Sequence, residues 1–479
     1  MNISMVLRTL GYVLAAEAAL LLLPLAVCLI YEEPPWPFLW TILLLAVGAA
    51  GLSFIRPHSR SIFAREGFII VSFSWILVSL AGALPFVFSG AIPNYVDALF
   101  ETISGFTTTG ASILQNVEIL PRGLLFWRSF THWIGGMGVL VFIMAVLPMA
   151  GERSMHVMRA EVPGPSVGKL VPRARHTAIL LYSIYLALTI IEVLFLLAGG
   201  MPLFDSLVNS FATAGTGGFS IKNASIGFYN SAYVDIVVTV FMLLFGINFN
   251  LYFFLLTRDF RQIFKNEELR VYLCVALGSM LLITFNIMPE AGNFASAFRQ
   301  ASFQVSSVMT TTGFSTTDFN LWPQFSRTIL FLLMILGACG GSTGGGLKVS
   351  RAIILVKRFV RDLVKQVHPR AVGSVRLDGR RVEDKTLHDV GIFFIAYMLI
   401  IGFMTLLVSL DGFSLETNLS AVVSCISNIG PGLDIVGPMG NFSGFSMLSK
   451  LLLSLTMLLG RLEIFPLLLS LTPILYRKK

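Results

Sequence analysis

The sequence predicts an all-α polytopic membrane protein, in which four related helix–loop–helix units follow two extra N-terminal transmembrane helices. Three observations predict this class: the composition, the long apolar stretches, and a motif that recurs four times between them. Of the 479 residues, 55% are hydrophobic and only 13% are charged, and the mean hydropathy is +0.81. Soluble domains carry roughly 25% charged residues, so the composition excludes an ordinary soluble fold.

Ten apolar stretches are each about long enough to cross about 30 Å of hydrocarbon as a helix. They cover residues 9–30, 38–54, 68–88, 124–149, 177–197, 233–256, 271–288, 328–354, 390–410 and 445–475. The first is longer than the apolar core of a signal peptide and lacks a clear cleavage site, so we expect a retained helix.

The distribution of lysine and arginine predicts the orientation. If both termini are cytoplasmic, the outer segments hold only Arg122, Arg128, Lys222, Arg299, Arg327 and Lys450. Apart from Arg461, which lies within the last stretch, the rest of the 34 lysines and arginines then fall in inner segments. This asymmetry follows the positive-inside rule. It explains the basic pI of about 9.4 without nucleic acid, and it favours contact with anionic lipid headgroups or an acidic partner.

Four long outer connections share one order: a weakly apolar helical stretch, a Thr/Gly-rich segment, and a polar return. This internal repeat divides the chain into two N-terminal helices (1–66) and four repeats (67–152, 153–265, 266–365 with an interrupted helix, and 366–479). One Thr-Thr-Gly alone would be an ordinary loop, so the signal lies in the repetition. The aligned segments are Thr107, Thr108, Thr109 and Gly110; Ala212, Thr213, Ala214 and Gly215; Thr310, Thr311, Thr312 and Gly313; Ser427, Asn428, Ile429 and Gly430.

Each helical stretch has about 9 to 15 residues, enough to enter roughly half a bilayer and stop. Non-helical backbone at that depth must be buried in protein or line a watery cavity. Four such segments around one axis place carbonyl and threonine oxygens where they can replace the hydration shell of a cation. The pore-helix C-termini add partial negative charge. The units are therefore predicted as potassium-channel-like helix–pore-helix–filter–helix repeats.

These motifs identify a resemblance. The sequence resembles the TrkH/TrkG/KtrB/HKT superfamily of potassium transporters over about residues 68–475, and the extra N-terminal pair resembles its TrkH branch. The matching stretches are Thr-Thr-Thr-Gly-Ala at 107–111, Thr-Thr-Thr-Gly-Phe-Ser at 310–315, Asn-Ile-Gly-Pro-Gly at 428–432, Gly-Ser-Thr-Gly-Gly-Gly at 341–346 and Leu-Leu-Gly-Arg-Leu-Glu-Ile at 458–464.

The resemblance implies potassium uptake across a bacterial cytoplasmic (inner) membrane through a gated, selective pore. It also implies a homodimer with one pore per subunit, a cytosolic TrkA-type nucleotide-binding ring, and no organic cofactor in this chain. Gly110 favours potassium, because sodium-preferring relatives have serine there. Ala214 and Ile429 depart from Thr-Thr-Gly, but those positions would contribute backbone carbonyls.

The eighth apolar stretch is interrupted by glycines from 337 to 346. Because each glycine costs roughly 1 kcal/mol in a helix, we expect a flexible intramembrane loop rather than a continuous span. A phosphate-binding loop is excluded, because Leu347 precedes Lys348 and no strand comes before it; a close helix-packing face of small residues stays open. The resemblance makes this loop a gate, with Gly344, Gly345, Gly346, Lys348 and Arg461 as its residues.

Arg461 lies deep in the last stretch, where a charge costs about 3 kcal/mol on insertion scales. A barrier to cations is the favoured interpretation, and a pair with Glu463 or snorkelling is the alternative. Glu17 and Glu192 also lie in apolar stretches, and ion coupling or internal pairing stays open for both.

Acidic residues near the outer helices allow two interpretations, attraction of cations or helix capping; they are Asp97, Glu101 and Asp205. The basic loop at 357–385 is either a positive-inside loop or a docking surface for the regulator. The four cysteines and six histidines show no metal-ligand spacing, so an enzyme is not expected. A sodium- or proton-coupled symporter on the same scaffold remains the alternative function.

Overall fold

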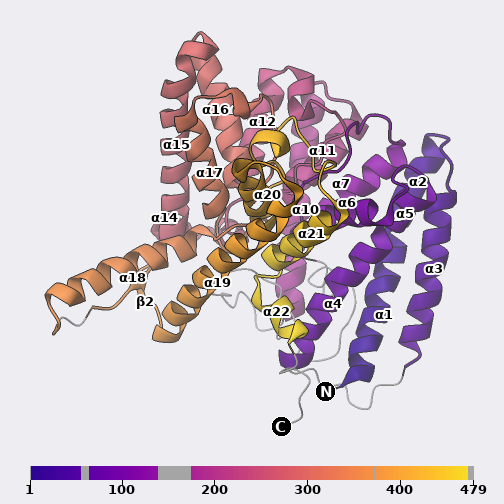
Figure 1. The fold of residues 1–479 in the computed structure, drawn as a ribbon, viewed down its shortest axis with the longest axis horizontal. Coiled ribbons are helices and arrows are strands. Elements are labelled where there is room, and N and C mark those ends of the chain that lie inside the picture. The colour runs from indigo at the N-terminus through magenta and orange to yellow at the C-terminus, as the bar shows by residue number, and fades with distance from the viewer. Residues whose placement is uncertain (1, 56–63, 139–173, 371–372, 473–479) are drawn as a thin grey trace.

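The computed structural model describes the chain except residues 1, 56–63, 139–173, 371–372 and 473–479. The described part is predominantly helical (Figure 1). Its first half contains α1 (Ile3–Leu20), α2 (Leu22–Ile30), α3 (Trp36–Ser53), α4 (Ala64–Gly82), α5 (Leu84–Phe88), α6 (Tyr95–Phe106), α7 (Arg122–Gly136), α10 (Ala174–Ala198), α11 (Leu203–Gly215), η2 (Ser225–Tyr229), α12 (Ala232–Phe245) and α13 (Phe249–Leu256).

The second half is helical in the same way and adds one small hairpin. It contains α14 (Phe260–Lys265), α15 (Glu267–Ala291), α16 (Phe294–Met309), η3 (Phe319–Leu321), α17 (Gln324–Leu336), α18 (Val349–Val367), β1 (Arg376–Leu377), β2 (Arg380–Arg381), α19 (Asp384–Val408), η4 (Ser409–Asp411), α20 (Leu415–Ser427), η5 (Asp434–Val436), α21 (Met447–Arg461) and α22 (Phe465–Leu471). The strands pair antiparallel, with Arg376 opposite Arg381.

Six helical segments of the described part are long and apolar enough to cross a membrane. They are Ile3–Ile30, Trp36–Ser53, Arg65–Phe88, Ala178–Ala198, Glu267–Ala291 and Asp384–Asp411. A seventh candidate, α12 followed by α13, is bent by 93°. Large apolar side chains on these segments are exposed, Ile30 at 73% and Leu399 at 67%. A lipid environment accounts for that exposure, so the chain is a multi-pass membrane protein.

The expectation of ten full spans is only partly met, because the helices that follow the short outer helices are broken. α12 and α13 are separated at residues 246–248, where the Asn248 side chain caps the new helix. α17 ends at Leu336, and Gly337, which caps it, has a φ of +74°. α21 ends at Arg461, and α22 begins after Glu463 and Ile464, which have positive φ. The fourth predicted stretch begins as α7, and its part beyond residue 138 lies outside the described residues.

Four short helices, α6, α11, α16 and α20, are buried among the longer ones, in the upper half of Figure 1. They have 12, 13, 16 and 13 residues. Side chains cap three of them: Asn94, Asn293 and Ser414 accept hydrogen bonds from first-turn amides, which satisfies otherwise orphan donors. Pro202 precedes α11. Their C-terminal ends position the candidate site.

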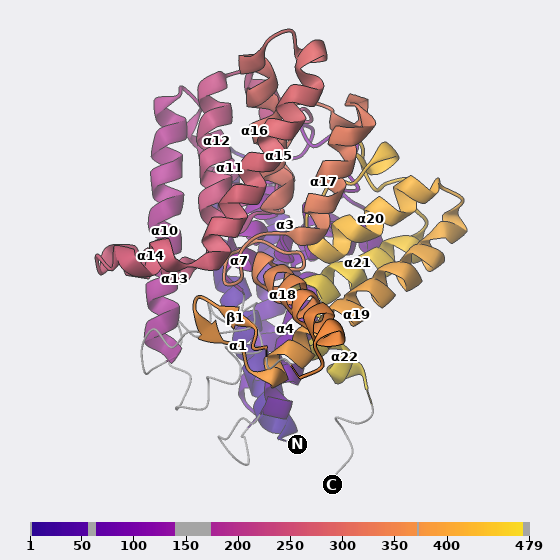
Figure 2. The same ribbon diagram turned by 90° about the vertical axis from the view of Figure 1, so that its left-hand side faces the viewer.

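α18 leaves the bundle below α14 and α17 and extends away from it to the left (Figure 1). Figure 2, turned by 90°, shows α18 in front of α4 and beside α19, with the hairpin at its flank. Ile354 packs against Val375, Leu387 and Val390 in a small apolar cluster. The first half of α18 is thus anchored, whereas its second half projects.

Candidate functional site

Four chain segments that follow the short helices share one backbone pattern. In each, a non-glycine residue with positive φ is followed two positions later by a glycine with positive φ. The pairs are Thr108 (55°) and Gly110 (81°), Thr216 (54°) and Gly218 (74°), Thr311 (60°) and Gly313 (86°), Asn428 (55°) and Gly430 (102°). Glycine adopts this region without steric cost, so each pattern turns the chain out of its helix in the same way.

Backbone hydrogen bonds repeat the pattern. The amides of Thr108 and Thr109 donate to the carbonyls of Gly105 and Ser104, at 3.1 and 2.8 Å. The two equivalent amides donate to carbonyls near the end of each of the other three helices. They belong to Thr216 and Gly217 after α11, to Thr311 and Thr312 after α16, and to Asn428 and Ile429 after α20. In all four segments, two consecutive amides at the helix end are thus satisfied by carbonyls of the helix itself.

The second segment corrects the sequence-based register. Residues 212–215 were predicted to align with 107–110, but Ala212, Thr213, Ala214 and Gly215 are the last residues of α11. The shared φ pattern falls three residues later, on Thr216 and Gly218. The physical reason lies in α11, which continues through Gly215 while Thr216 forms its left-handed cap. In the first, third and fourth segments the φ pattern falls within the predicted residues 107–110, 310–313 and 427–430, and their role in ion binding stays a prediction.

The four segments form a closed ring. A methyl group added at Gly110, Gly218 or Gly313 would overlap the carbonyl oxygen of Gly217, Thr312 or Ile429, respectively. A methyl group at Gly430 would lie 2.8 Å from the carbonyl oxygen of Thr109, which closes the ring. Only glycine permits this approach, since real Cβ atoms do not come so close.

One cavity of about 170 Å³ is lined by all four glycines, Gly110, Gly218, Gly313 and Gly430. Its wall also includes Ser112, Ser220 and Ser315 from the polar returns; the charged side chains on it are Arg128 and Lys222. The glycine backbone and the serine hydroxyls supply oxygens to this wall, and among its described residues no charged side chain is a carboxylate. Such oxygens can coordinate a dehydrated cation without the full negative charge that would trap it.

The polar returns are also joined in a ring. Val117 donates its amide to Asn223 Oδ1 at 2.9 Å, which joins the first and second returns. Gly227 donates to the carbonyl of Ser315 at 3.1 Å, and Phe442 to the carbonyl of Ser112 at 2.8 Å. These contacts join the second return to the third and the fourth to the first.

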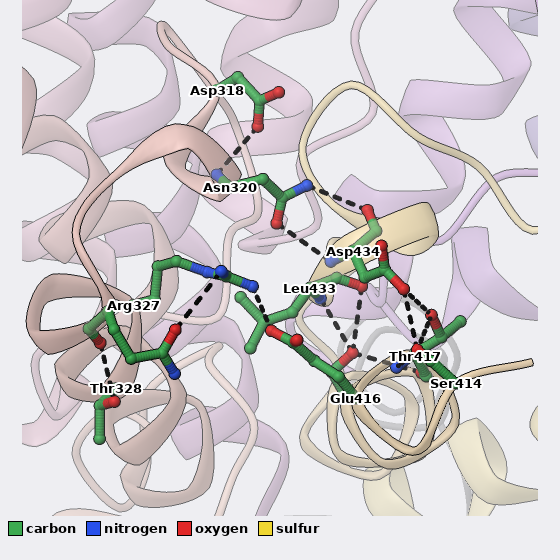
Figure 3. A network of polar contacts seen from close by, with 11 residues as sticks. Asp318, Asn320, Arg327, Thr328, Ser414, Glu416, Thr417, Leu433 and Asp434 are labelled. Carbon is green, nitrogen blue, oxygen red and sulfur yellow. Dashed lines mark hydrogen bonds and ion pairs between the residues drawn. The ribbon is translucent and has the colours of Figure 1, made fainter.

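Figure 3 shows the contact between the third and fourth returns. Asn320 donates through Nδ2 to the Asp434 carbonyl and accepts from the Asp434 amide, both at 3.0 Å. The Asp434 carboxylate accepts from the hydroxyls of Thr417 and Ser414, at 2.6 and 2.9 Å. These hydroxyl bonds hold the pKa of Asp434 below its ordinary value, because they stabilise the carboxylate.

A buried ion pair that the sequence did not reveal supports the first two segments. Arg128 of α7 donates from Nε to Glu101 of α6 at 2.6 Å, and the two side chains are 3% and 0% exposed. Glu101 also accepts from Ser112 and from the amide of Ile113, while Arg128 donates to the carbonyl of Ser220 at 2.9 Å. The sequence left attraction of cations or helix capping open for Glu101. In the structure, its carboxylate instead accepts hydrogen bonds from the polar return of the first repeat, at Ser112 and Ile113.

The glycine-rich loop between α17 and α18 lies directly beneath the ring. Gly345 donates its amide to Thr311 Oγ1 at 2.7 Å. A methyl group at Gly344 would lie 2.9 Å from the Thr310 carbonyl, and one at Gly345 would overlap the Ser427 carbonyl. The interruption predicted at 337–346 is present, and its middle contacts the third and fourth segments.

The ends of this loop are held by a residue that sequence analysis missed. Glu268, in the first turn of α15, is 6% exposed. One of its oxygens accepts from the amide of Gly340 at 2.7 Å and from the amide of Ser350 at 3.0 Å. Because Gly340 lies within the loop and Ser350 opens α18, one carboxylate fixes both flanks. In the sequence, Glu268 follows Glu267, and the pair is typical of the acidic residues that favour the first turn of a helix.

Arg461 and Lys348 both contact the loop from within. Arg461 donates to the Thr343 carbonyl at 2.9 Å and to the carbonyls of Gly135 and Gly136 at the end of α7, the latter at 2.7 Å. Lys348 is buried and donates to the carbonyl of Gly344.

The alternative pairing of Arg461 with Glu463 is not what the structure shows. Glu463 pairs with Arg351, in the first turn of α18. The pair ties α18 to the break between α21 and α22.

The remaining acidic candidates have structural partners or lie elsewhere. Asp97 pairs with Lys450 at 2.7 Å, and Asp205 accepts from the Tyr229 hydroxyl at 2.8 Å. Glu17 and Glu192 are buried in α1 and α10. In the described part of the chain, no three His, Cys, Asp or Glu side chains are grouped as metal ligands.

The family model for TrkH, described as a cation transport protein, matches residues 38–475. The chain is 37% identical to the Trk system potassium uptake proteins TrkH of Salmonella typhimurium and Escherichia coli K12, over 100% of each chain. It is 33% identical to the Trk system potassium uptake protein TrkG of Escherichia coli K12, over 97% of both chains.

A solved structure has the same fold. The crystal structure of the potassium transporter TrkH from Vibrio parahaemolyticus matches with a TM-score of 0.89 and 34% identity, over 100% of both chains. The activity that these matches indicate is transport and not enzymatic catalysis. The chain, with its four-glycine ring and the loop beneath that ring, therefore belongs to the TrkH family of cation transport proteins.

Proposed function

We propose that this protein takes up potassium ions across the bacterial cytoplasmic membrane through a gated, potassium-selective pore. The observation that carries the proposal is the ring of four positive-φ glycines lining one cavity. The names of its relatives, potassium uptake proteins at 33–37% identity, support the choice of ion. Potassium is the transported substrate.

The proposed selectivity filter consists of residues 107–110, 215–218, 310–313 and 427–430. Residues 215–218 take the place of 212–215, because the shared φ pattern falls on Thr216 and Gly218. Backbone carbonyls would coordinate the ion. The hydroxyls of Thr107 and Thr109 share one hydrogen bond, and those of Thr310 and Thr312 share another, at 2.8 Å in both segments. The short helices α6, α11, α16 and α20 would act as pore helices, with C-terminal ends that favour a cation.

The proposed gate is the glycine loop with Gly344, Gly345 and Gly346, together with Lys348 and Arg461. Two cationic side chains beneath the ring would raise an electrostatic barrier against an outgoing cation. Displacement of the loop away from Thr311 and Ser427 would open the path. Arg461 bonds both the loop and α7, so its contacts would have to break on opening.

The proposed assembly is a homodimer regulated by a cytosolic TrkA-type nucleotide-binding ring, with both termini in the cytoplasm and lipid around the spans. The family naming as a Trk system supports a partner. The repeat boundaries 67–152, 153–265, 266–365 and 366–479 after the first 66 residues remain part of this proposal. The tip of the basic hairpin, residues 378–380 at the proposed cytoplasmic face, would be available to a partner.

A sodium- or proton-coupled symporter is the second candidate, because two carboxyl groups, Glu17 and Glu192, are buried in apolar helices. Flux in reconstituted vesicles tests both functions. Potassium and rubidium are expected to pass and sodium and lithium to be excluded, with uptake independent of the sodium and proton gradients. Equal flux of all four ions would contradict the selective pore, and uptake that needs a sodium or proton gradient would favour the symporter.

A further inference from the structure

The second half of α18 is an amphipathic helix whose apolar face is uncovered. Apolar side chains recur at helical spacing along it and are 45–73% exposed: Val356, Phe359, Val360, Leu363, Val364 and Val367. Such a continuous stripe marks an interaction surface on most proteins. Nothing in the described part of the chain covers it.

A basic groove runs beside this stripe. Lys357, Arg361 and Lys365 follow one another at four-residue spacing on α18, and Arg376 and Arg381 approach from the hairpin. Together they line a groove of about 960 Å³. Its wall also includes Val356, Val360 and Val364, so one side of the groove is cationic and the other is apolar.

Only part of the positive charge in the groove is neutralised. Lys357 pairs with Glu267 at 2.5 Å, Arg361 with Asp362 at 2.8 Å, and Arg381 with Asp384 at 3.3 Å. The surrounding cations lower the pKa of Asp362, chiefly through its hydrogen bond from Arg361.

Further cationic side chains of the groove carry uncompensated charge, and Lys365 and Arg376 are two of them. Within the residues that the structure describes, Lys365 and Arg376 have no carboxylate within 4.0 Å. The groove therefore presents net positive charge to an anion.

The position of α18 fits the edge of a membrane. The helix starts at the gate loop, where Val349 is buried, and then extends away from the bundle below α14 (Figure 1). In the proposed orientation the segment that contains α14 is cytoplasmic, and α18 lies on that side. Lysine and arginine side chains there can extend toward headgroups while an apolar stripe enters the acyl region.

We propose that this groove binds the phosphate headgroup of an anionic phospholipid of the cytoplasmic leaflet, with the acyl chain along the valine wall. A lipid satisfies both surfaces, whereas a soluble phosphate would leave the apolar wall exposed to water. The site depends on the proposed orientation of the chain but not on its ion selectivity.

Lipid retention by the intact, detergent-solubilised protein tests the proposal. Native mass spectrometry would compare retained phosphatidylglycerol with phosphatidylcholine in the wild type and in Lys365→Gln/Arg376→Gln. We expect the preference for phosphatidylglycerol to fall roughly tenfold or more in this double variant, since each cation near a headgroup contributes to attraction. Arg261→Gln/Lys265→Gln, which removes two exposed cations of α14, is the matched control and should retain the preference.

A second variant separates the apolar contribution. Phe359→Ser/Leu363→Ser should reduce the retention of both lipids while leaving thermal unfolding within a few degrees of the wild type. Equal preference for phosphatidylglycerol in all variants would overturn the proposal. So would displacement of the lipid by inorganic pyrophosphate, which would indicate a soluble anion, or a change confined to the monomer–dimer ratio, which would indicate that a second copy covers the stripe.

Discussion

Arg461 and Thr343 lie 118 residues apart in the chain, and the guanidinium of Arg461 donates to the carbonyl oxygen of Thr343 at 2.9 Å. The same guanidinium holds the end of α7. One charged side chain thus fixes the loop beneath the ring to the first repeat.

Removal of Arg461 should destabilise the closed loop. Hydrogen bonds to charged groups contribute about 1.5–3 kcal/mol, so Arg461→Gln should raise basal potassium leak by roughly tenfold or more without a regulator. Efflux from potassium-loaded vesicles measures the leak. Arg299→Gln removes an arginine that is 41% exposed at its side chain and pairs with Asp235, and it should leak like the wild type. Equal leak from both variants would contradict the gate role.

Glu268→Gln should loosen the same loop from its flanks. The substitution keeps the shape of the side chain but removes the negative charge of the carboxylate, which accepts hydrogen bonds from the amides of Gly340 and Ser350. Hydrogen bonds to a charged group are the stronger ones, so basal leak should rise several-fold. Glu267→Gln is the control, because Glu267 pairs with Lys357 away from the loop. Vesicle efflux measures the change, and Glu268→Asp should restore part of the wild-type behaviour. Potassium selectivity over sodium should stay intact, and a parallel loss of selectivity would contradict a role confined to the loop.

The corrected register predicts which residues of the second segment control selectivity. Gly218→Ala would place a methyl group against the Thr312 carbonyl in a left-handed backbone, at a cost of at least about 1 kcal/mol. We expect its potassium-to-sodium flux ratio to fall at least severalfold. Thr213→Ala removes a hydroxyl that bonds Asn209 inside α11 and should keep the wild-type ratio. A lower potassium-to-sodium flux ratio in Thr213→Ala than in Gly218→Ala would instead favour residues 212–215 as the filter segment.

The buried pair of Glu101 and Arg128 should dominate the stability of the outer half. Removing one partner of a buried pair costs about 3–5 kcal/mol, because the other charge stays uncompensated. Glu101→Ala should therefore lower the midpoint of thermal unfolding in detergent by many degrees. Replacing both with methionine should be milder than the single change. Asp362→Asn, at an exposed pair of α18, should cost less than about 1 kcal/mol; a similar loss there would refute the ranking.

The contact in Figure 3 predicts a pH dependence. Because the folded pKa of Asp434 lies below its ordinary value of 3.8, its contribution is complete above that ordinary value. It is lost as pH falls through the lower, folded pKa. Asp434→Asn should thus be less stable than the wild type at neutral pH, and the two should converge under strongly acidic conditions. Unfolding midpoints across that range measure this; a constant difference would contradict it.

The sequence allowed three of the four ring segments to be placed, because Thr-Thr-Gly or its equivalent directly follows a helical stretch. The second segment has three glycines, Gly215, Gly217 and Gly218, and the sequence alone does not reveal which one adopts positive φ. In the structure only Gly218 of these three has positive φ. The other two are required by space instead, because a methyl group at Gly215 or Gly217 would overlap His132 of α7. The sequence does not separate these two requirements, since the second depends on a contact between distant segments.

Spans were predicted better than their breaks. Hydropathy measures transfer into lipid, not helix continuity, so the bend between α12 and α13 was invisible, whereas the glycines at 337–346 indicated the loop. Glu268 and the Glu101–Arg128 pair were missed for a related reason. Their roles depend on partners 72 and 27 residues away, and local patterns describe only neighbours.

The most direct test locates the ion. Anomalous diffraction from crystals soaked in rubidium should show peaks on the axis between the carbonyls near Gly110, Gly218, Gly313 and Gly430. Sodium-grown crystals without rubidium should show none there. Rubidium peaks found only outside this ring, with the ring itself empty, would contradict the proposed pore.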